Sequence, residues 1–307
     1  MEFNHYSVML KETVDGMEIS EGGVYVDCTF GGGGHSSLIL SRIGNGKLYG
    51  FDRDSDAITN GQEKFSDDRL CLINENFSNA SRELKERGVF QINGAVIDLG
   101  VSSYQLDNPE RGFSYRFDAP LDMRMDRRES LTAYDVINGY SKSELIRIFK
   151  EYGEERFSPL FASVIEKTRE KKPIETTLEL CELIRNSAPA KKPSEKMDCV
   201  KRIFQSVRIE INAELKVIEQ ALTDLMDMTV SGGRIAVITF HSLEDKIVKR
   251  TFKKFENPCE CDPRYPCVCG KEAVGRVITK KPLLPTEDEL SENNRSHSAK
   301  LRICEKL

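Results

Sequence analysis

The stretch Val24-Tyr25-Val26-Asp27-Cys28-Thr29-Phe30-Gly31-Gly32-Gly33-Gly34-His35 decides the expected fold. Its first half predicts a strand, and the glycines after it are typical of a tight turn before a helix. Glycines at such a turn let a nucleotide lie against backbone N–H groups at the helix N-terminus. A second acid, Asp52, follows the glycines at about the distance where an acid binds a ribose, about 20 residues. The sequence therefore predicts a nucleoside-cofactor site.

The first hundred residues alternate between short apolar runs and longer amphipathic runs. The expected strands are 24–29, 47–52, 70–73 and 92–99, and the expected helices are 36–42, 54–65 and 78–87. Such alternation predicts a parallel sheet with helices on both faces.

The pattern changes after residue 100. Residues 131–189 have only helical periodicity, and apolar residues spaced three or four apart predict one long helix over 195–228. The strand-helix pattern then resumes, with strands expected at 234–240, 274–279 and 299–304 and a helix at 243–255. We therefore predict one α/β sheet domain formed by residues 1–107 and 208–307, with an all-helical domain, residues 108–207, inserted into it.

Composition excludes several classes of protein. The net charge of -5 argues against a wholly basic nucleic-acid coat, although an excess of basic residues over 246–282 is compatible with a local anion-binding face as well as a solvated one. No apolar run approaches the ~18 residues of a membrane span. The N-terminus does not resemble a secretory signal, and nine cysteines without one indicate a reducing, cytoplasmic location.

The type of cofactor follows from residues around the glycine loop. Ser36 stands where the dinucleotide fingerprint has its third glycine. Asp27 would repel a pyrophosphate but attract a sulfonium, which favours S-adenosylmethionine over NAD. Phe77 follows the third expected strand and could stack on an adenine. Asp98 ends the fourth strand, at the edge where open sheets bind their ligands.

At these residues the chain resembles the bacterial ribosomal RNA small-subunit methyltransferase H family, also called the MraW family. The matching stretches are His5–Glu12, Thr29–Ser36, Phe51–Asp54, Asp98–Ser103 with Gln105-Leu106, Glu110–Ser114, Pro120–Asp126, Tyr152–Phe157, Phe204-Gln205 with Arg208-Ile209, and Phe240–Asp245. The resemblance implies a Rossmann-like class I methyltransferase sheet with an inserted helical domain. It also implies methyl transfer from S-adenosylmethionine to the exocyclic N4 of a cytidine in the decoding region of 16S rRNA.

The resemblance implies roles for particular residues. It places the cofactor against Gly33, Gly34 and His35, with Asp52 on the ribose and Phe77 by the adenine. It adds Asp98 and Gln105 near the methionine end. The implied partner is 16S rRNA, within the small ribosomal subunit and away from any membrane. The oligomeric state, monomer or homodimer, stays open.

The attacking amine needs a proton acceptor, and three residues are candidates. Asp98 lies at the expected edge, and Asp122 and His241 are candidates to reach it. Asp122 could instead form a loop salt bridge with Arg124, and His241 could instead cap a helix.

A four-cysteine segment and two other functions also remain open. No catalytic metal is expected, but Cys259, Cys261, Cys267 and Cys269 could hold one structural zinc ion or be reduced thiols of a loop. The alternative functions are an NAD-linked oxidoreductase on the same sheet and a non-catalytic RNA-binding module for ribosome assembly.

Overall fold

The computed structural model describes residues 7–262, 264, 266 and 268–307, so His5, Tyr6 and Cys267 lie outside the described residues. The chain divides into two compact units. The sheet unit consists of residues 1–100 and 215–307, and the helical unit is Val101–Glu214. The helical unit extends beyond both ends of the predicted 108–207. Its last helix, α10 (Pro193–Asn212), continues past residue 207, and α5 (Ser103–Asp107) precedes residue 108.

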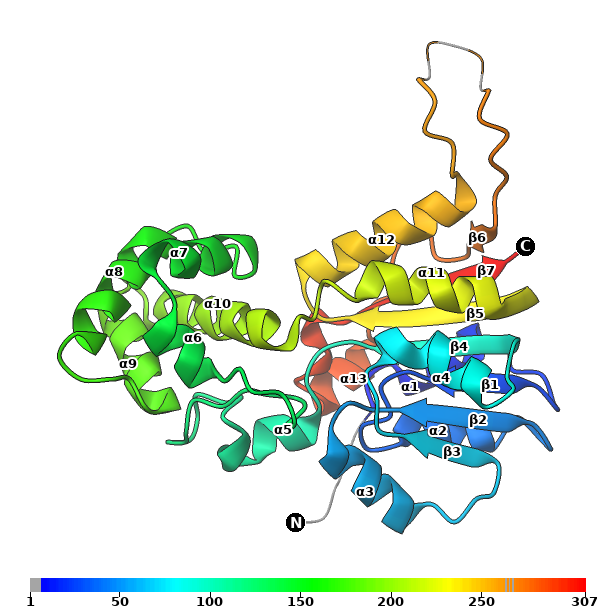
Figure 1. The fold of residues 1–307 in the computed structure, drawn as a ribbon, viewed down its shortest axis with the longest axis horizontal. Helices are drawn as coiled ribbons and strands as arrows, with labels where there is room; N and C mark the ends of the chain where they lie inside the picture. The colour runs from blue at the N-terminus through cyan, green and yellow to red at the C-terminus, as the bar shows by residue number, and fades with distance from the viewer. Residues whose placement is uncertain (1–6, 263, 265, 267) are drawn as a thin grey trace. The chain divides into compact units, whose positions relative to one another are not determined.

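The sheet unit contains a seven-stranded sheet in the order β3-β2-β1-β4-β5-β7-β6 (Figure 1). Its strands are β1 (Val24–Asp27), β2 (Lys47–Phe51), β3 (Leu70–Ile73), β4 (Ile92–Asp98), β5 (Thr229–Thr239), β6 (Gly275–Val277) and β7 (Lys300–Lys306). Strands β1 to β5 run parallel, and β7 is antiparallel to both β5 and β6. The strand order reverses between β1 and β4, which is where open α/β sheets bind ligands. The predicted Rossmann-like α/β sheet is confirmed.

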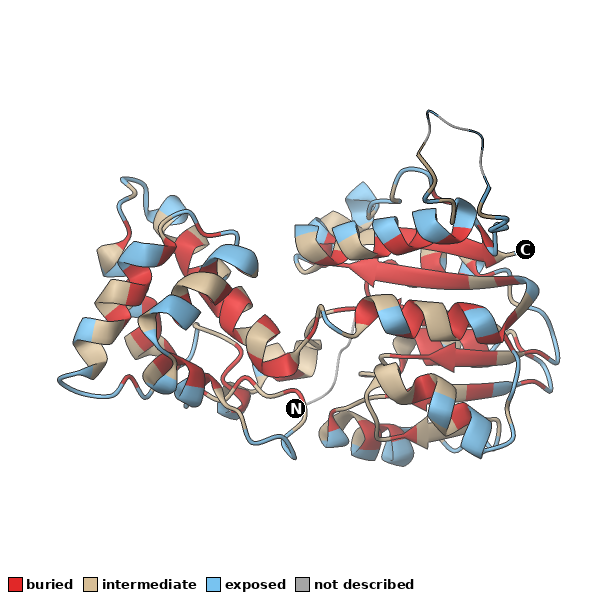
Figure 2. Cartoon of the chain, turned by 45° about the horizontal axis from the view of Figure 1, so that its top comes forward, coloured by how far each residue is buried: buried red, intermediate tan, exposed pale blue. Residues whose placement is uncertain are grey.

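Helices cover both faces of this sheet. They are α1 (Leu10–Gly16), α2 (Gly34–Leu40), α3 (Ser55–Lys64), α4 (Ala80–Glu86), α11 (Ile218–Met228), α12 (Ser242–Glu256) and α13 (Glu287–Glu292). Val26 and Val237 pack with Leu222 on one face, whereas Val96 and Ile238 belong to a separate core on the other. Buried strands between two helical layers follow from the near-continuous apolar runs in the sequence (Figure 2).

The predicted long helix over 195–228 is wrong. The structure has α10 and α11 instead, because Ala213 adopts a left-handed conformation with φ 49° and ends α10. The apolar spacing runs through this break without interruption, so periodicity alone predicts one helix.

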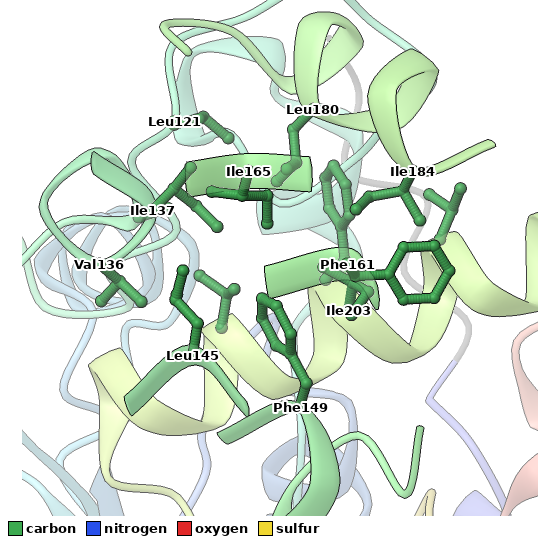
Figure 3. Packing of buried hydrophobic residues seen from close by; sticks show 14 of the residues in the cluster. Leu121, Val136, Ile137, Leu145, Phe149, Phe161, Ile165, Leu180, Ile184 and Ile203 are labelled. Carbon is green, nitrogen blue, oxygen red and sulfur yellow. The ribbon is translucent and has the colours of Figure 1, made fainter. Parts of the chain in front are cut away.

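The helical unit also contains α6 (Ala133–Gly139), α7 (Lys142–Glu151), α8 (Ser158–Arg169) and α9 (Thr177–Ser187). Figure 3 shows its separate core, where side chains such as Leu145, Phe149 and Phe161 converge. Reciprocal capping boxes begin three of these helices, at Thr132, Ser141 and Thr176. Within the described residues, no helix of either unit is long and apolar enough to cross a membrane.

Candidate functional site

The loop after β1 is held in shape by Asp27. This residue is 1% exposed, and its Oδ2 accepts a hydrogen bond from Oγ of Ser36 at 2.7 Å. The backbone N–H of Thr29 donates to Oδ1 at 3.2 Å. Burial raises the pKa of Asp27 to about 6. One oxygen therefore binds the loop and the other binds α2, so Asp27 has a structural role, and its attraction of a sulfonium remains a prediction.

Asp52 joins the end of β2 to the same loop. Its Oδ2 accepts the N–H of Gly31 at 2.8 Å, and its Oδ1 accepts the N–H of Asp54 at 2.9 Å. Burial raises the pKa of Asp52 to about 7, although these two amide bonds act in the opposite direction. A half-buried carboxylate with remaining lone pairs can accept hydrogen bonds from a ribose diol.

Gly31 leaves open space beside Asp52. A side chain added at this position would meet no atom closer than the carbonyl oxygen of Thr29, at 3.8 Å. Its φ of +51° also lies in the region that favours glycine. No other atom lies within 4 Å of such a Cβ, so Gly31 leaves an open cradle on the loop that a nucleoside can occupy.

Gly33 and Gly34 are required by the protein's own packing. A Cβ on Gly33 would lie 2.6 Å from Cε2 of Phe65, and one on Gly34 would lie 1.8 Å from Oγ of Ser7. Phe65 and Ser7 therefore occupy the space that a side chain at Gly33 or Gly34 would need. The cofactor contacts predicted for Gly33, Gly34 and His35 remain predictions. At the two glycines, such contacts would be made by backbone atoms.

Asp98 ends β4 beside β1, where the strand order reverses. Its backbone N–H donates to Oγ1 of Thr29 at 2.7 Å, and its Oδ2 lies 4.0 Å from Nδ1 of the buried His35. Among the described residues, no group bonds its buried Oδ1. Burial raises the pKa of Asp98 well above its ordinary value, and three neighbouring acids, Asp27, Glu244 and Glu289, raise it further. A cationic or hydrogen-bond-donating ligand would complete this site.

Phe77 and Gln105 have structural contacts of their own. Phe77 begins the 3₁₀ helix η1 (Phe77–Asn79) and is half-buried against the core that contains Leu222. Gln105 belongs to the helical unit, and its Oε1 accepts the N–H of Ser102 at 3.1 Å in a reciprocal capping box. Their predicted contacts, with an adenine and with the methionine end, therefore remain predictions.

Asp122 forms the loop salt bridge that the sequence left open. It lies in the helical unit, and Nε and Nη2 of Arg124 contact its two oxygens at 3.0 Å and 2.7 Å. Burial acts to raise the pKa of Asp122, but the Arg124 guanidinium and backbone N–H hold it below the ordinary value. A carboxylate paired in this way is a weak proton acceptor, so its catalytic role stays a prediction.

His241 caps α12, as the alternative interpretation expected. Its Nδ1 accepts the N–H of Glu244 at 3.4 Å, and Oε2 of Glu244 accepts the N–H of Phe240 at 2.8 Å. Glu244 is 1% exposed, and sequence reasoning missed it as a residue that affects Asp98. The spacing of a cap and an acid three residues apart is the signal that could have found it.

Helix α12 carries the densest part of the basic excess. Arg250 and Lys254 both pair with Glu219 of α11, at 2.6 Å and 2.7 Å. Lys246, Lys249 and Lys253 are exposed on the same helix. Part of the excess is therefore used within the sheet unit, and the rest is compatible with an anionic partner.

Comparisons with known proteins extend over both units. A family model described as the MraW methylase family matches residues 2–307. A protein named ribosomal RNA small subunit methyltransferase H, from Clostridium botulinum (strain Loch Maree / Type A3), is 51% identical over 310 residues and covers 100% of each chain. Its namesake from Carboxydothermus hydrogenoformans is 50% identical and covers 100% of this chain and 99% of its own. A solved rRNA methylase from Streptococcus thermophilus aligns with a TM-score of 0.44 at 12% identity, over 98% of each chain.

Proposed function

Because this chain belongs to the MraW methylase family, we propose that it methylates the exocyclic N4 of a cytidine in 16S rRNA, at the decoding region. The chain is a methyltransferase, and S-adenosylmethionine is its methyl donor. The cytidine, its N4 atom and the region of the rRNA are parts of the proposal. So are the small ribosomal subunit as the form of the substrate and the bacterial cytoplasm as the place of the reaction.

The structural observation that best supports the proposal concerns Oδ1 of Asp98. This buried oxygen has no hydrogen-bond partner among the described residues, and its strand end lies where the sheet order reverses. A buried, unsatisfied carboxylate oxygen is costly unless a ligand completes it. The open space at Gly31 and the carboxylate of Asp52 support a nucleoside beside it. These groups suit the adenosine and the cationic end of S-adenosylmethionine.

The chain has four tasks in the proposed reaction. When bound, S-adenosylmethionine supplies an electrophilic methyl group on a positively charged sulfur. Asp52 accepts hydrogen bonds from the ribose and so fixes the nucleoside. The Asp98 carboxylate stabilises positive charge near the methionine end, where low dielectric strengthens the attraction. Holding methyl and amine in line then supplies a large part of the acceleration.

Proton removal is the remaining task. The N4 lone pair forms the new bond to the methyl carbon while the carbon–sulfur bond breaks, and the sulfur keeps that electron pair. The amine then carries an extra proton, which must leave to an acceptor. We propose Asp98 for this role, because its raised pKa makes it a stronger base than an ordinary carboxylate. Asp122 is held by Arg124 and His241 caps α12, which favours Asp98 among the three candidates.

The proposal is tested by mass analysis of nucleosides. Small ribosomal subunits from a strain that lacks this protein are incubated with purified full-length chain and methyl-labelled S-adenosylmethionine, and the RNA is digested. We expect label in N4-methylcytidine, from one position in the decoding region. If the chain binds the cofactor but no label enters N4-methylcytidine, the proposed acceptor is wrong.

Two variants separate binding from chemistry. Asp52→Asn should weaken cofactor binding, measured by calorimetry, whereas Glu63→Gln on the exposed face of α3 is the matched control and should not. Asp98→Asn should weaken cofactor binding, because it removes the charge near the methionine end, and should also lower the rate at saturating S-adenosylmethionine by about 100-fold or more, because it removes the proton acceptor. Weaker binding with an unchanged rate at saturation would assign Asp98 to binding alone.

The family assignment removes the support for an NAD-linked oxidoreductase. The non-catalytic assembly module predicts RNA affinity without turnover, so the same labelling experiment distinguishes it. No observation in the structure favours it over the methyltransferase.

A further inference from the structure

A long connection joins α12 to β6 and contains the cysteine motif (Figure 1). Within the described part of residues 257–274 there is no helix or strand. Connections of this length without secondary structure are uncommon in compact domains, and many of them are functional. The proposed methyl transfer uses no residue of this connection, so its cysteines need a separate explanation.

The sulfur atoms of Cys259, Cys261 and Cys269 converge. All three Sγ atoms lie within 4.8 Å of one another. Zinc bound by thiolates has Zn–S bonds of about 2.3 Å, which places tetrahedral sulfurs about 3.8 Å apart. Shifts of about 1 Å or less would thus bring the three sulfurs onto one ion. The fourth cysteine of the motif, Cys267, lies outside the described residues.

The burial pattern of the connection differs from that of a hydrophobic core. The three cysteines are half-buried, whereas Val268 between them in the sequence is 89% exposed. The thiols are therefore less exposed than the large apolar side chain of Val268, which points to solvent. Ordering each residue costs about 1–2 kcal/mol of backbone entropy, and apolar burial offsets little of it here. A metal cross-link orders such a segment, because the free energy of metal binding adds to that of folding.

A salt bridge joins the two arms of the connection beside the cysteines. Lys271 binds Glu260 at 3.0 Å, next to Cys259 and Cys269 in the sequence. The Lys271 ammonium would also balance part of the negative charge of a zinc–thiolate centre.

We propose that Cys259, Cys261 and Cys269 bind a structural zinc ion that orders the connection between α12 and β6. All three ligands lie on a connection that contributes no residue to the proposed methyl transfer. The zinc is therefore structural, and methyl transfer does not run through it. Soft thiolate ligands favour zinc over magnesium or calcium.

The test measures metal content in the full-length chain, independently of methyl transfer. The protein is purified with reductant from zinc-supplemented cells, dialysed against metal-free buffer and analysed by plasma mass spectrometry. We expect about one zinc per chain, and a large loss of zinc in Cys261→Ser and in Cys259→Ser/Cys269→Ser. The control is Cys71→Ser, a half-buried cysteine on β3 that should leave the zinc content unchanged.

Cobalt gives a second readout of the ligands. Co²⁺ added to the metal-free protein should produce an intense thiolate-to-metal absorption in the near ultraviolet, which Cys261→Ser abolishes. Circular dichroism identifies any variant that has simply failed to fold. The proposal is overturned if the folded wild-type chain retains no zinc, or if Cys259→Ser/Cys269→Ser retains as much as the wild type. A thiol titration that finds a disulfide among these cysteines in the fresh, metal-free protein would also overturn it.

Discussion

The backbone N–H of Gly31 donates to Oδ2 of Asp52 at 2.8 Å, and this bond connects the loop after β1 to the end of β2. The glycine loop and the acid, which the sequence predicts to form one site, are thus directly connected. The bond orients the carboxylate beside the open position at Gly31. The pKa of Asp52, about 7, makes this arrangement sensitive to pH near neutrality.

Affinity for S-adenosylmethionine should therefore fall as pH decreases below about 7. Burial raises the pKa of Asp52 to about 7, and that of Asp98 is also raised. Below its pKa each carboxyl holds a proton, which makes it a weaker acceptor of ribose hydrogen bonds and removes the charge that attracts a cation. Each such group lowers the affinity by up to about tenfold per pH unit in that range.

Calorimetry at several pH values and in buffers of different ionisation enthalpy measures this effect. Proton release on binding should increase as pH falls from 8 to 6. An affinity that stays constant over this range would show that both carboxylates are already ionised in the free protein.

Gly31→Ala should weaken cofactor binding more than it destabilises the fold. The left-handed backbone costs alanine about 1 kcal/mol, and no protein atom clashes with the added Cβ. Gly88→Ala is the matched control, since Gly88 also has a positive φ and open surroundings but lies after α4, away from the loop. Both variants should show similar loss of unfolding free energy by denaturation. Equal cofactor affinity in the two would refute the cradle at Gly31.

Asp122→Asn should lower stability more clearly than it lowers the rate of methyl transfer. Both oxygens of Asp122 bind Arg124, and the two side chains are 19% and 22% exposed. Loss of such a pair costs about 1–3 kcal/mol. Asp198→Asn is the control, because Asp198 and its partner Lys201 are 50% and 58% exposed and an exposed pair contributes about 0–1 kcal/mol. A 100-fold fall in turnover with unchanged stability would instead make Asp122 the proton acceptor.

Ala213→Gly should stabilise the chain by about 0.5–1 kcal/mol. Ala213 ends α10 with φ 49°, where glycine lacks the Cβ penalty and is the usual residue. The same change at Ala221, inside α11, should destabilise by about 1 kcal/mol. Urea denaturation of the three proteins measures both effects. If both glycine variants lose stability equally, the left-handed turn at Ala213 carries no strain.

The sequence alone determined the strands, the alternation that makes the sheet parallel, and the helical character of the insertion. Apolar periodicity, glycine turns and capping residues act over a few neighbouring residues, so a linear reading can detect them. The same local signals indicated Asp52 and Asp98 at strand ends. The salt bridge of Asp122 and the helix cap of His241 could also be predicted from the sequence, because each joins residues only two or three positions apart.

Only the tertiary structure decided what each of these groups contacts. Ala213 breaks a helix whose apolar spacing is continuous, because its left-handed conformation leaves no signature in the hydrophobic pattern. Gly33 is needed because the ring of Phe65, far along the chain, packs against it. Asp27 turns inward to Ser36, whereas Oδ1 of Asp98 is left without a partner among the described residues. Burial and pairing depend on which distant segments the fold brings together, and the desolvation that sets these pKa values exists only once they have met.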